Sequence, residues 1–207
     1  MRLALVRHGV TLLNEHGHYQ GQCDPPLSQA GQDECAQAAA QIGGLRWALV
    51  CSSPQLRARA TARALQGGVD RVPVRVVANL RERHLGDIDG RCRRCVEAQS
   101  PGTAARLIGD RDYAPPGGGE SLTTVRTRAL AAVADLAQDC DPGGPVVAVT
   151  HGAVIAALTG GTVGEVAPLH AAVVDVDGPH ITAVDIGIRL SLLTNIFDHQ
   201  REGQVPT

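Results

Sequence analysis

The sequence contains no lysine, and all 19 of its basic residues are arginine. This absence excludes chemistry that needs an amine side chain, such as a Schiff base or the lysine of a Gly-Lys-Ser/Thr phosphate loop. An anion bound by this chain must therefore be held by arginine, histidine, backbone N–H groups or a metal ion.

Aromatic residues are also scarce, at 2% of the chain, and the formal net charge is only −2. Nucleic acid bases would find almost nothing to stack on, and no basic excess would attract a phosphate backbone. No apolar run approaches the length of a membrane span, and residues 1–10 resemble a core strand rather than a cleavable signal. We therefore expect no nucleic acid partner, no membrane partner and a cytoplasmic protein.

Six cysteines are spread over a chain that shows no signal segment, which favours reduced thiols over a disulfide framework. Cys92 and Cys95 have the spacing of a metal or redox pair, but no second pair follows at zinc-site spacing. The two arginines between them would also oppose a dication, so two incidental thiols are the favoured interpretation. The histidines of His16-Gly17-His18 are equally weak evidence, and we expect no metal site.

The length of 207 residues fits one domain, residues 1–207, with a core large enough to need no disulfides. Short apolar runs alternate with helical patterns, which predicts an α/β fold: a three-layer αβα sandwich with a mostly parallel central sheet. Strands are expected at 3–6, 47–51, 72–77 and 145–149, helices at 28–42, 54–65, 122–137 and 153–158, and an antiparallel hairpin at 173–186.

Local signals refine these expectations. Ser28 is typical of an N-cap, and Pro54 of the first residue of a helix. Residues 91–117 would form a short cap or insertion, and residues 198–207 a loose tail. The free edge of the closing hairpin could pair with a second copy and give a homodimer.

Candidate functional residues follow the predicted strands, where the loops of a parallel sheet share one rim. Two histidines, two arginines and one carboxylate suit the transfer of a dianionic group. The arginines would hold its oxygens, one imidazole would attack, and the carboxylic acid would protonate the leaving oxygen. Two histidines and a glutamate could instead bind zinc, although two converging arginines disfavour that alternative. These residues are Arg7, His8, Arg57, Glu82 and His151.

From residue 3 to about residue 160, six ordered blocks resemble the histidine phosphatase superfamily, also called the phosphoglycerate mutase-like fold. The blocks are Leu5-Val6-Arg7-His8-Gly9 with Thr11 and Asn14; Tyr19-Gln20-Gly21 with Asp24 and Pro26-Leu27-Ser28; Ser52-Ser53-Pro54 with Arg57-Ala58 and Thr61-Ala62; Glu82 with Gly86 to Gly90; Gly118-Gly119-Glu120-Ser121; and Thr150-His151-Gly152.

The resemblance implies a role for each matching residue. His8 would be the nucleophile that becomes phosphohistidine, with Arg7, Arg57 and a protonated His151 around the phosphoryl group. Glu82 would be the general acid and then the base for water. Further phosphate-binding positions would be Asn14, Gln20, Gly21 and Gly152. No metal or other cofactor is implied.

The superfamily contains mutases and phosphatases, and this sequence departs from the mutase pattern. Leu85 and Val10 stand where mutases usually carry tyrosine and glutamate, and the substrate-binding lysine is missing. The segment between Gly90 and Gly118 is short, so water should reach the phosphohistidine. We therefore expect a phosphatase, a phosphoric monoester hydrolase acting on a small phosphorylated metabolite. The alternatives are a phosphoglycerate mutase-type phosphotransferase and, less favoured, a phosphate-ligand binding protein without turnover.

The sequence leaves the substrate open. An arginine cluster near the insertion could recognise a second anionic group or could be a solvated face, and helical context slightly favours the solvated face. The cluster comprises Arg81, Arg83, Arg91, Arg93 and Arg94.

Overall fold

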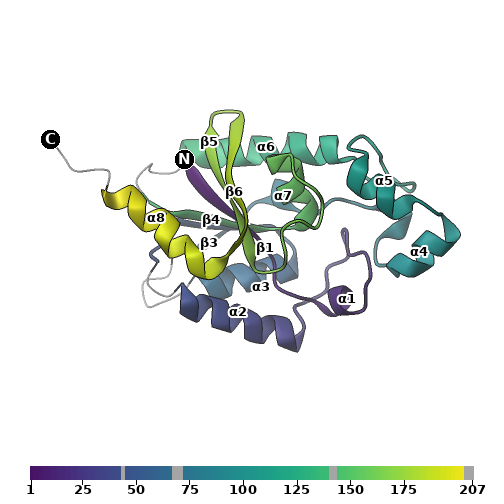
Figure 1. Ribbon diagram of the computed structural model, residues 1–207, viewed down its shortest axis with the longest axis horizontal. Coiled ribbons are helices and arrows are strands. Elements are labelled where there is room, and N and C mark those ends of the chain that lie inside the picture. The colour runs from purple at the N-terminus through teal and green to yellow at the C-terminus, as the bar shows by residue number, and fades with distance from the viewer. Residues whose placement is uncertain (43–44, 67–71, 140–143, 203–207) are drawn as a thin grey trace.

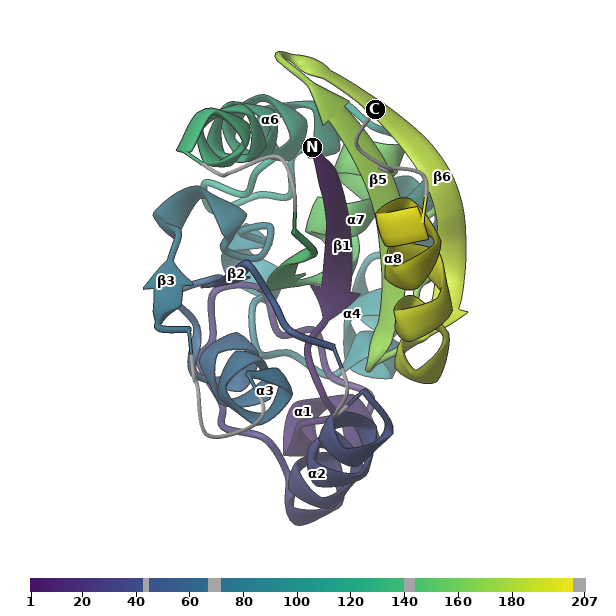
Figure 2. The same ribbon diagram turned by 90° about the vertical axis from the view of Figure 1, so that its left-hand side faces the viewer.

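A six-stranded sheet forms the centre of the computed structural model, which describes residues 1–42, 45–66, 72–139 and 144–202. The strands lie in the order β3-β2-β4-β1-β5-β6, with β3 at one edge and the β5–β6 hairpin at the other (Figure 2). Their bounds are β1 Arg2–Arg7, β2 Leu49–Ser52, β3 Val74–Val76, β4 Val146–Thr150, β5 His170–Asp177 and β6 His180–Arg189. The first four strands in sequence pair in parallel, whereas β5 and β6 run antiparallel, so the expected mostly parallel sheet is confirmed.

Helices cover both faces of this sheet (Figure 1), as the predicted three-layer sandwich requires. Their bounds are α1 Leu12–Glu15, α2 Gln29–Gln41, α3 Leu56–Leu65, α4 Arg93–Gln99, α5 Thr103–Gly109, α6 Leu122–Asp139, α7 Gly152–Thr159 and α8 Leu193–Glu202; short 3-10 turns are η1 Ala78–Leu80, η2 Gly86–Ile88 and η3 Leu190–Leu192. Within the ranges just given for the chain, no helix is both long and apolar enough to cross a membrane.

The alternation of side chains along the strands divides the core in two. Leu3 and Leu5 of β1 face α6 and α7, while Ala4 and Val6 face α2, α3 and α8. In α6 the apolar positions expected from the helical period are all buried, which confirms that helix and its orientation: Leu122, Val125, Ala129, Ala132, Val133 and Leu136. Both faces of the central strands are therefore buried, as a parallel sheet requires.

Two helix starts show how far capping residues can be inferred from sequence. Ser28 caps α2, and its side chain accepts the amide of Gly31, as predicted. Pro54 is not the first helical residue, because Gln55 is the N-cap of α3 and Leu56 begins the helix. The carboxylate of Asp24 accepts the Leu56 amide at 2.7 Å. A distant aspartate therefore satisfies the first turn, which a local motif could not indicate.

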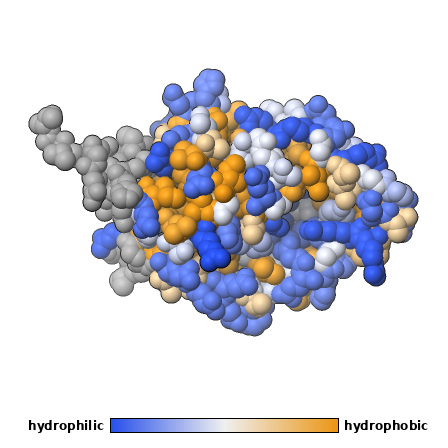
Figure 3. All heavy atoms as spheres, viewed as in Figure 1, coloured by the Kyte–Doolittle hydropathy of each residue, from blue (hydrophilic) through white to orange (hydrophobic). Residues whose placement is uncertain are grey.

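The C-terminal expectation is wrong for residues 198–202, which belong to α8 rather than to a loose tail. The helix is retained because Leu193 and Phe197 are buried against the core beside Trp47, whose ring meets that of Phe197 edge-on at 6.0 Å. Residues 203–207 lie outside the described residues, and so do the glycine pairs at 43–44 and 67–68 that follow the predicted helices 28–42 and 54–65. In the space-filling view a hydrophobic patch lies over β6 and the adjoining start of α8 (Figure 3), where Val184 and Leu192 are exposed.

The insertion at 91–117 contains α4 and α5 and is anchored by a buried arginine. Arg83 is only 2% exposed and donates to three backbone carbonyls, those of Glu120 at 2.7 Å, Leu107 at 3.0 Å and Tyr113 at 2.6 Å. The guanidinium thus ties the segment after β3 to α5 and to the loop before α6. Its planar set of donors suits this task, since a lysine could not reach three divergent carbonyls.

We expect Arg83→Met to lower the free energy of unfolding by about 3 kcal/mol, because three buried carbonyls lose charge-assisted partners. Urea unfolding measures the change. The matched control is Arg63→Met on the exposed face of α3, which should shift stability by less than about 0.5 kcal/mol. Equal stability of the two variants would contradict the anchoring role.

Candidate active site

The register of the two central strands brings the histidines together. β1 and β4 are parallel with Arg7 opposite Thr150, so His8 and His151 leave neighbouring strands at the same level. The His8 amide donates to the Thr150 carbonyl at 3.0 Å, and the two imidazole centroids are 5.1 Å apart. Both side chains are almost fully buried. The prediction that they share one rim is confirmed by this register.

The tautomer of His8 is set by its neighbour. Nδ1 lies 2.7 Å from the Gly9 carbonyl oxygen, which can only accept, so Nδ1 carries the proton. Nε2 is then an acceptor, and it receives the Arg57 Nε–H at 3.3 Å. Burial, and next the charge of Arg57, lower the pKa of His8 well below its usual value. His8 is thus a neutral imidazole with its lone pair directed toward a guanidinium.

Arg57 extends from the first turn of α3, as predicted, and is completely buried. It donates to the carbonyls of Cys23 at 2.7 Å and Gly21 at 3.1 Å in addition to His8. Gly21 has a positive φ of 48°, and a Cβ there would lie 1.5 Å from an oxygen of Asp89, so only glycine fits. The loop after β1 is therefore shaped to hold the guanidinium against the histidine.

Among the residues that the structure describes, two buried polar atoms at the centre of the site have no hydrogen-bond partner, namely Nε of Arg7 and Nδ1 of His151. Other atoms of the same two side chains are bonded: Nη1 of Arg7 donates to the Val166 carbonyl at 2.9 Å, and His151 Nε2 lies 2.7 Å from Ser53 Oγ. Burial, then Arg57 and His8, lower the pKa of His151 well below the usual range. The imidazole of His151 is thereby biased toward its neutral form, and its protonation around a bound phosphoryl group stays a prediction.

Glu82 supplies the carboxylate at this rim. Its Oε1 accepts the amide of Arg83 at 2.9 Å, and its own amide donates to the side chain of Gln55 at 2.8 Å. Gln55 also donates to the Gly21 carbonyl at 3.0 Å. One side chain therefore links the main chain of Glu82 to the loop that holds Arg57. Burial raises the pKa of Glu82 despite the lowering effect of Arg57, Arg7 and Arg128. The carboxyl is thereby biased toward the protonated form that a general acid needs.

A cavity of about 430 Å³ opens above these groups. Arg7, His8 and Glu82 line it directly, and so do all four expected phosphate-binding positions, Asn14, Gln20, Gly21 and Gly152. Asn14 and Gln20 both accept hydrogen bonds from Thr11, which holds them in the loop after β1. Gly152 begins α7, whose first amides face an anion favourably. Arg57 and His151 lie behind His8 rather than in the cavity wall.

Sequence reasoning gave Ser53 no role of its own, although it orients His151, and it assigned none to Gln55, which positions Glu82. Ser53 directly follows β2, so the same rule of strand ends could have identified it. Gln55 carries no such signal, since its role depends on two loops that meet only in the folded chain.

The arginine cluster does not act as one unit. Arg83 is buried and structural, so the favoured solvated face is wrong for it. Arg81 lies 3.6 Å from Glu120, and Arg91 donates to Gln99 at 2.5 Å. Arg93 and Arg94, at the start of α4, line the cavity.

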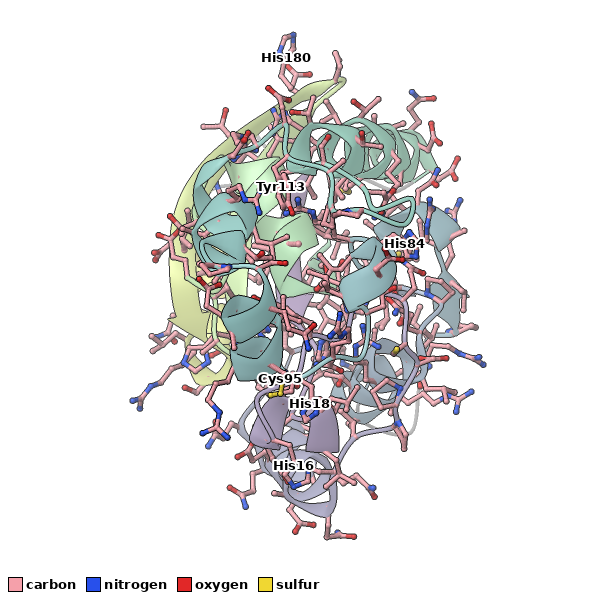
Figure 4. The ribbon with its side chains drawn as sticks, turned by 90° about the vertical axis from the view of Figure 1, so that its right-hand side faces the viewer. His16, His18, His84, Cys95, Tyr113 and His180 are labelled. Carbon is pink, nitrogen blue, oxygen red and sulfur yellow. The ribbon has the colours of Figure 1, made fainter. Side chains whose placement is uncertain are left out.

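The cysteine and histidine pairs near α4 gain no metal-site support. The Cys92 sulfur accepts the Cys95 amide at 3.3 Å as the N-cap of α4. His18 pairs with Cys92 through an isolated bridge, and Figure 4 shows the labelled His18 and Cys95 near one another, with His16 lower on the surface. Among the residues with described positions, no three His, Cys, Asp or Glu side chains are grouped to hold a metal ion.

Residues 3–186 match the family model of the histidine phosphatase superfamily (branch 1). The chain belongs to this superfamily. The expected fold family and enzyme class, a histidine phosphatase-type phosphoric monoester hydrolase, are thus confirmed.

Relatives of this histidine phosphatase include phosphatases from bacteria and plants. A glucosyl-3-phosphoglycerate phosphatase of Mycolicibacterium vanbaalenii is 40% identical over 169 residues, 79% of this chain and 74% of the relative. A metal-independent phosphoserine phosphatase of Arabidopsis thaliana is 32% identical over 158 residues, 75% of this chain and 66% of the relative. The solved structure of a mycobacterial glucosyl-3-phosphoglycerate phosphatase complexed with VO3 superposes with a TM-score of 0.79 at 32% identity, covering 91% of this chain and 99% of that one.

We expect orthovanadate or inorganic phosphate to stabilise the protein, because a tetrahedral oxyanion satisfies the orphaned atoms of Arg7 and His151. At a hundredfold excess over Kd the gain is about 2.7 kcal/mol, or a rise in Tm of roughly 5–10 °C. Differential scanning fluorimetry measures it. Arg57→Met should abolish the rise, whereas Arg63→Met on the same helix should keep it. A rise retained in Arg57→Met would place the anion elsewhere.

Proposed function

We propose that this chain is a metal-independent phosphomonoesterase that transfers the phosphoryl group of a small phosphorylated metabolite to Nε2 of His8 and then to water. The observation that carries the proposal is the neutral, singly oriented His8, whose lone pair faces Arg57 beside two buried nitrogen atoms without a hydrogen-bond partner among the described residues. A dianionic phosphoryl group is the ligand that satisfies those atoms and presents an electrophilic phosphorus to the lone pair.

Binding of the phosphoryl group would use charges that are already in place. Arg57 would donate a hydrogen bond to one phosphoryl oxygen in place of its bond to His8 Nε2. The Nε–H of Arg7 would donate to a second phosphoryl oxygen. The first amides of α7 and Nδ1 of His151 are available to the third. A bound dianion would raise the pKa of His151, so this imidazole would gain a proton. The resulting imidazolium would donate a hydrogen bond to the phosphoryl oxygen and keep its proton. These fixed groups stabilise the charge of the transition state.

Glu82 is the proposed general acid. In the first half-reaction the phosphorus–oxygen bond to the leaving group breaks as the Nε2–phosphorus bond forms, and the Glu82 proton moves to the leaving oxygen. In the second, water attacks phosphorus and gives a proton to the Glu82 carboxylate, and the Nε2–phosphorus bond breaks. Inorganic phosphate leaves, and Glu82 is again protonated.

The two pKa shifts act together. At their ordinary values of 6.5 for histidine and 4.5 for glutamic acid, a neutral histidine beside a protonated glutamic acid would be scarce at every pH. Burial lowers the pKa of the histidine and raises that of the glutamic acid, so the reactive pair of protonation states becomes more populated than it would be at the ordinary values. One physical cause, the burial of the two side chains, favours the neutral form of the nucleophile and the protonated form of the acid.

The small cap favours a phosphatase over a mutase. Between Gly90 and Gly118 the chain forms only the short helices α4 and α5, and the cavity beneath them opens to the surface. Water can therefore reach the phosphohistidine within each turnover. A cytoplasmic location remains a prediction, as do the single-domain organisation and the homodimer.

Glu82→Gln separates the acid role from binding. We expect its kcat/KM to fall at least a hundredfold on an alkyl phosphate, whose leaving oxygen needs the proton, and far less on para-nitrophenyl phosphate. The wild type should also lose activity on the alkyl ester as pH rises through the raised pKa of Glu82, and the variant should lack that limb. Equal losses on both esters would remove Glu82 from the acid role.

The function itself is tested by phosphate release in the presence of EDTA. Wild-type protein should release one phosphate per ester consumed, and His8→Ala should show no turnover while still gaining stability from vanadate. Incubation with 3-phosphoglycerate and catalytic 2,3-bisphosphoglycerate is the counter-test. Rapid formation of 2-phosphoglycerate with little free phosphate would assign a mutase, and normal turnover by His8→Ala would refute the phosphohistidine.

A further inference from the structure

The cavity above His8 has two unlike sides. Six apolar side chains from separate parts of the chain form one of them, with no side-chain hydrogen-bond donor or acceptor among them. They are Leu85 before η2, Ala104, Leu107 and Ile108 of α5, Ala153 of α7, and Val163 after α7. The cavity volume of about 430 Å³ lies in the range of sites for whole small molecules, so the leaving group of a phosphate ester would also be enclosed.

The apolar side is a rigid wall. Leu107 is buried with Ile88 and Val96 in a small separate core, and Leu85 packs against the same cluster. Glu97 of α4 accepts the amides of Gly102 and Ala104, which caps α5 and ties the two cap helices together. Ile108 is different, because 46% of it is exposed although it lines the cavity. The wall thus includes one large apolar side chain, Ile108, that is about half exposed to solvent.

The α4 side of the cavity is polar, and Arg93, Arg94 and Glu97 line it. Within the part of the chain that the structure describes, the guanidinium groups of Arg93 and Arg94 donate no hydrogen bond and form no ion pair, although that of Arg93 lies 5.5 Å from the centre of the Tyr19 ring. In Figure 3 the surface is hollowed here, with hydrophobic residues on the α5 side and strongly hydrophilic ones on the α4 side. The two arginines on the α4 side attract the phosphate dianion, and the apolar side remains for the rest of the ester.

The position of Glu82 gives the direction of the leaving group. Its oxygen must meet the Glu82 carboxyl, and Glu82 lines the same cavity as Leu85 and the α5 residues Leu107 and Ile108. We infer, on the basis of the proposed function, that the natural substrate is a phosphomonoester whose leaving group presents an apolar ring or chain to Leu85, Leu107, Ile108 and Val163. Sugar phosphates and phosphoglycerates fit this wall less well, because their hydroxyl and carboxyl groups would lose water without gaining partners there.

A homologous series of alkyl phosphates from methyl to hexyl tests this subsite, since leaving-group chemistry changes little along it. We expect kcat/KM to rise by about fourfold per added methylene until the wall is filled, the factor that corresponds to 0.8 kcal/mol per buried CH₂. Hexyl phosphate should then exceed 3-phosphoglycerate and glucose 6-phosphate more than tenfold.

Ile108→Ser locates the effect, because Ile108 is half-exposed and its loss leaves the small core intact. The increment should flatten to about twofold per methylene, and Ile108→Leu should restore it. The control is Leu192→Ser, equally exposed at 48% beside α8, which should keep the full increment. A flat series in the wild type, or a preference for the hydroxylated esters, would overturn the subsite and leave the phosphatase standing. Absence of hydrolysis of every ester would instead refute the proposed function.

Discussion

Arg7 and Arg57 lie beside two histidines at the buried end of a parallel sheet, and the rest of the site depends on this concentration of positive charge. Removing such groups from water is costly unless they are held by hydrogen bonds. Here the carbonyls of Gly21, Cys23 and Val166 hold them, and the loops that supply those carbonyls are thereby fixed. Burial lowers the pKa of both arginines without removing their charge at any ordinary pH. The site remains electrically incomplete until an anion enters.

The same charge would let the proposed site select among ligands by their number of oxygens. A dianion with several oxygens could accept hydrogen bonds from Arg7, Arg57, His151 and the start of α7 together. A single carboxylate would leave some of these donors without a partner. The lack of lysine is consistent with this arrangement, because guanidinium groups direct hydrogen bonds in fixed planes and a buried amine would tend to lose its proton. Recognition and catalysis therefore share one set of contacts.

The fold and the meeting of the candidate residues at one rim could be predicted because they follow from local rules. Buried strands end at His8 and His151, and parallel pairing then forces the two histidines together. The roles of Arg83, Gln55 and Asp24 could not be predicted, since each bridges segments more than 25 residues apart in the chain. The lowered pKa of His151 could not be predicted from the sequence either. It depends on how completely water is excluded and on charges from three different elements.

The hydrogen bond from Nδ1 of His8 to the Gly9 carbonyl decides which ring nitrogen could react. Only one ring nitrogen would be available to phosphorus, so the proposed covalent intermediate would be a single positional isomer, the one phosphorylated at the nitrogen remote from the main chain. The phosphorylated ring would keep its Nδ1 proton, and with it a positive charge that makes imidazole a good leaving group. A backbone carbonyl that never touches phosphorus would thus select the isomer and keep the intermediate short-lived.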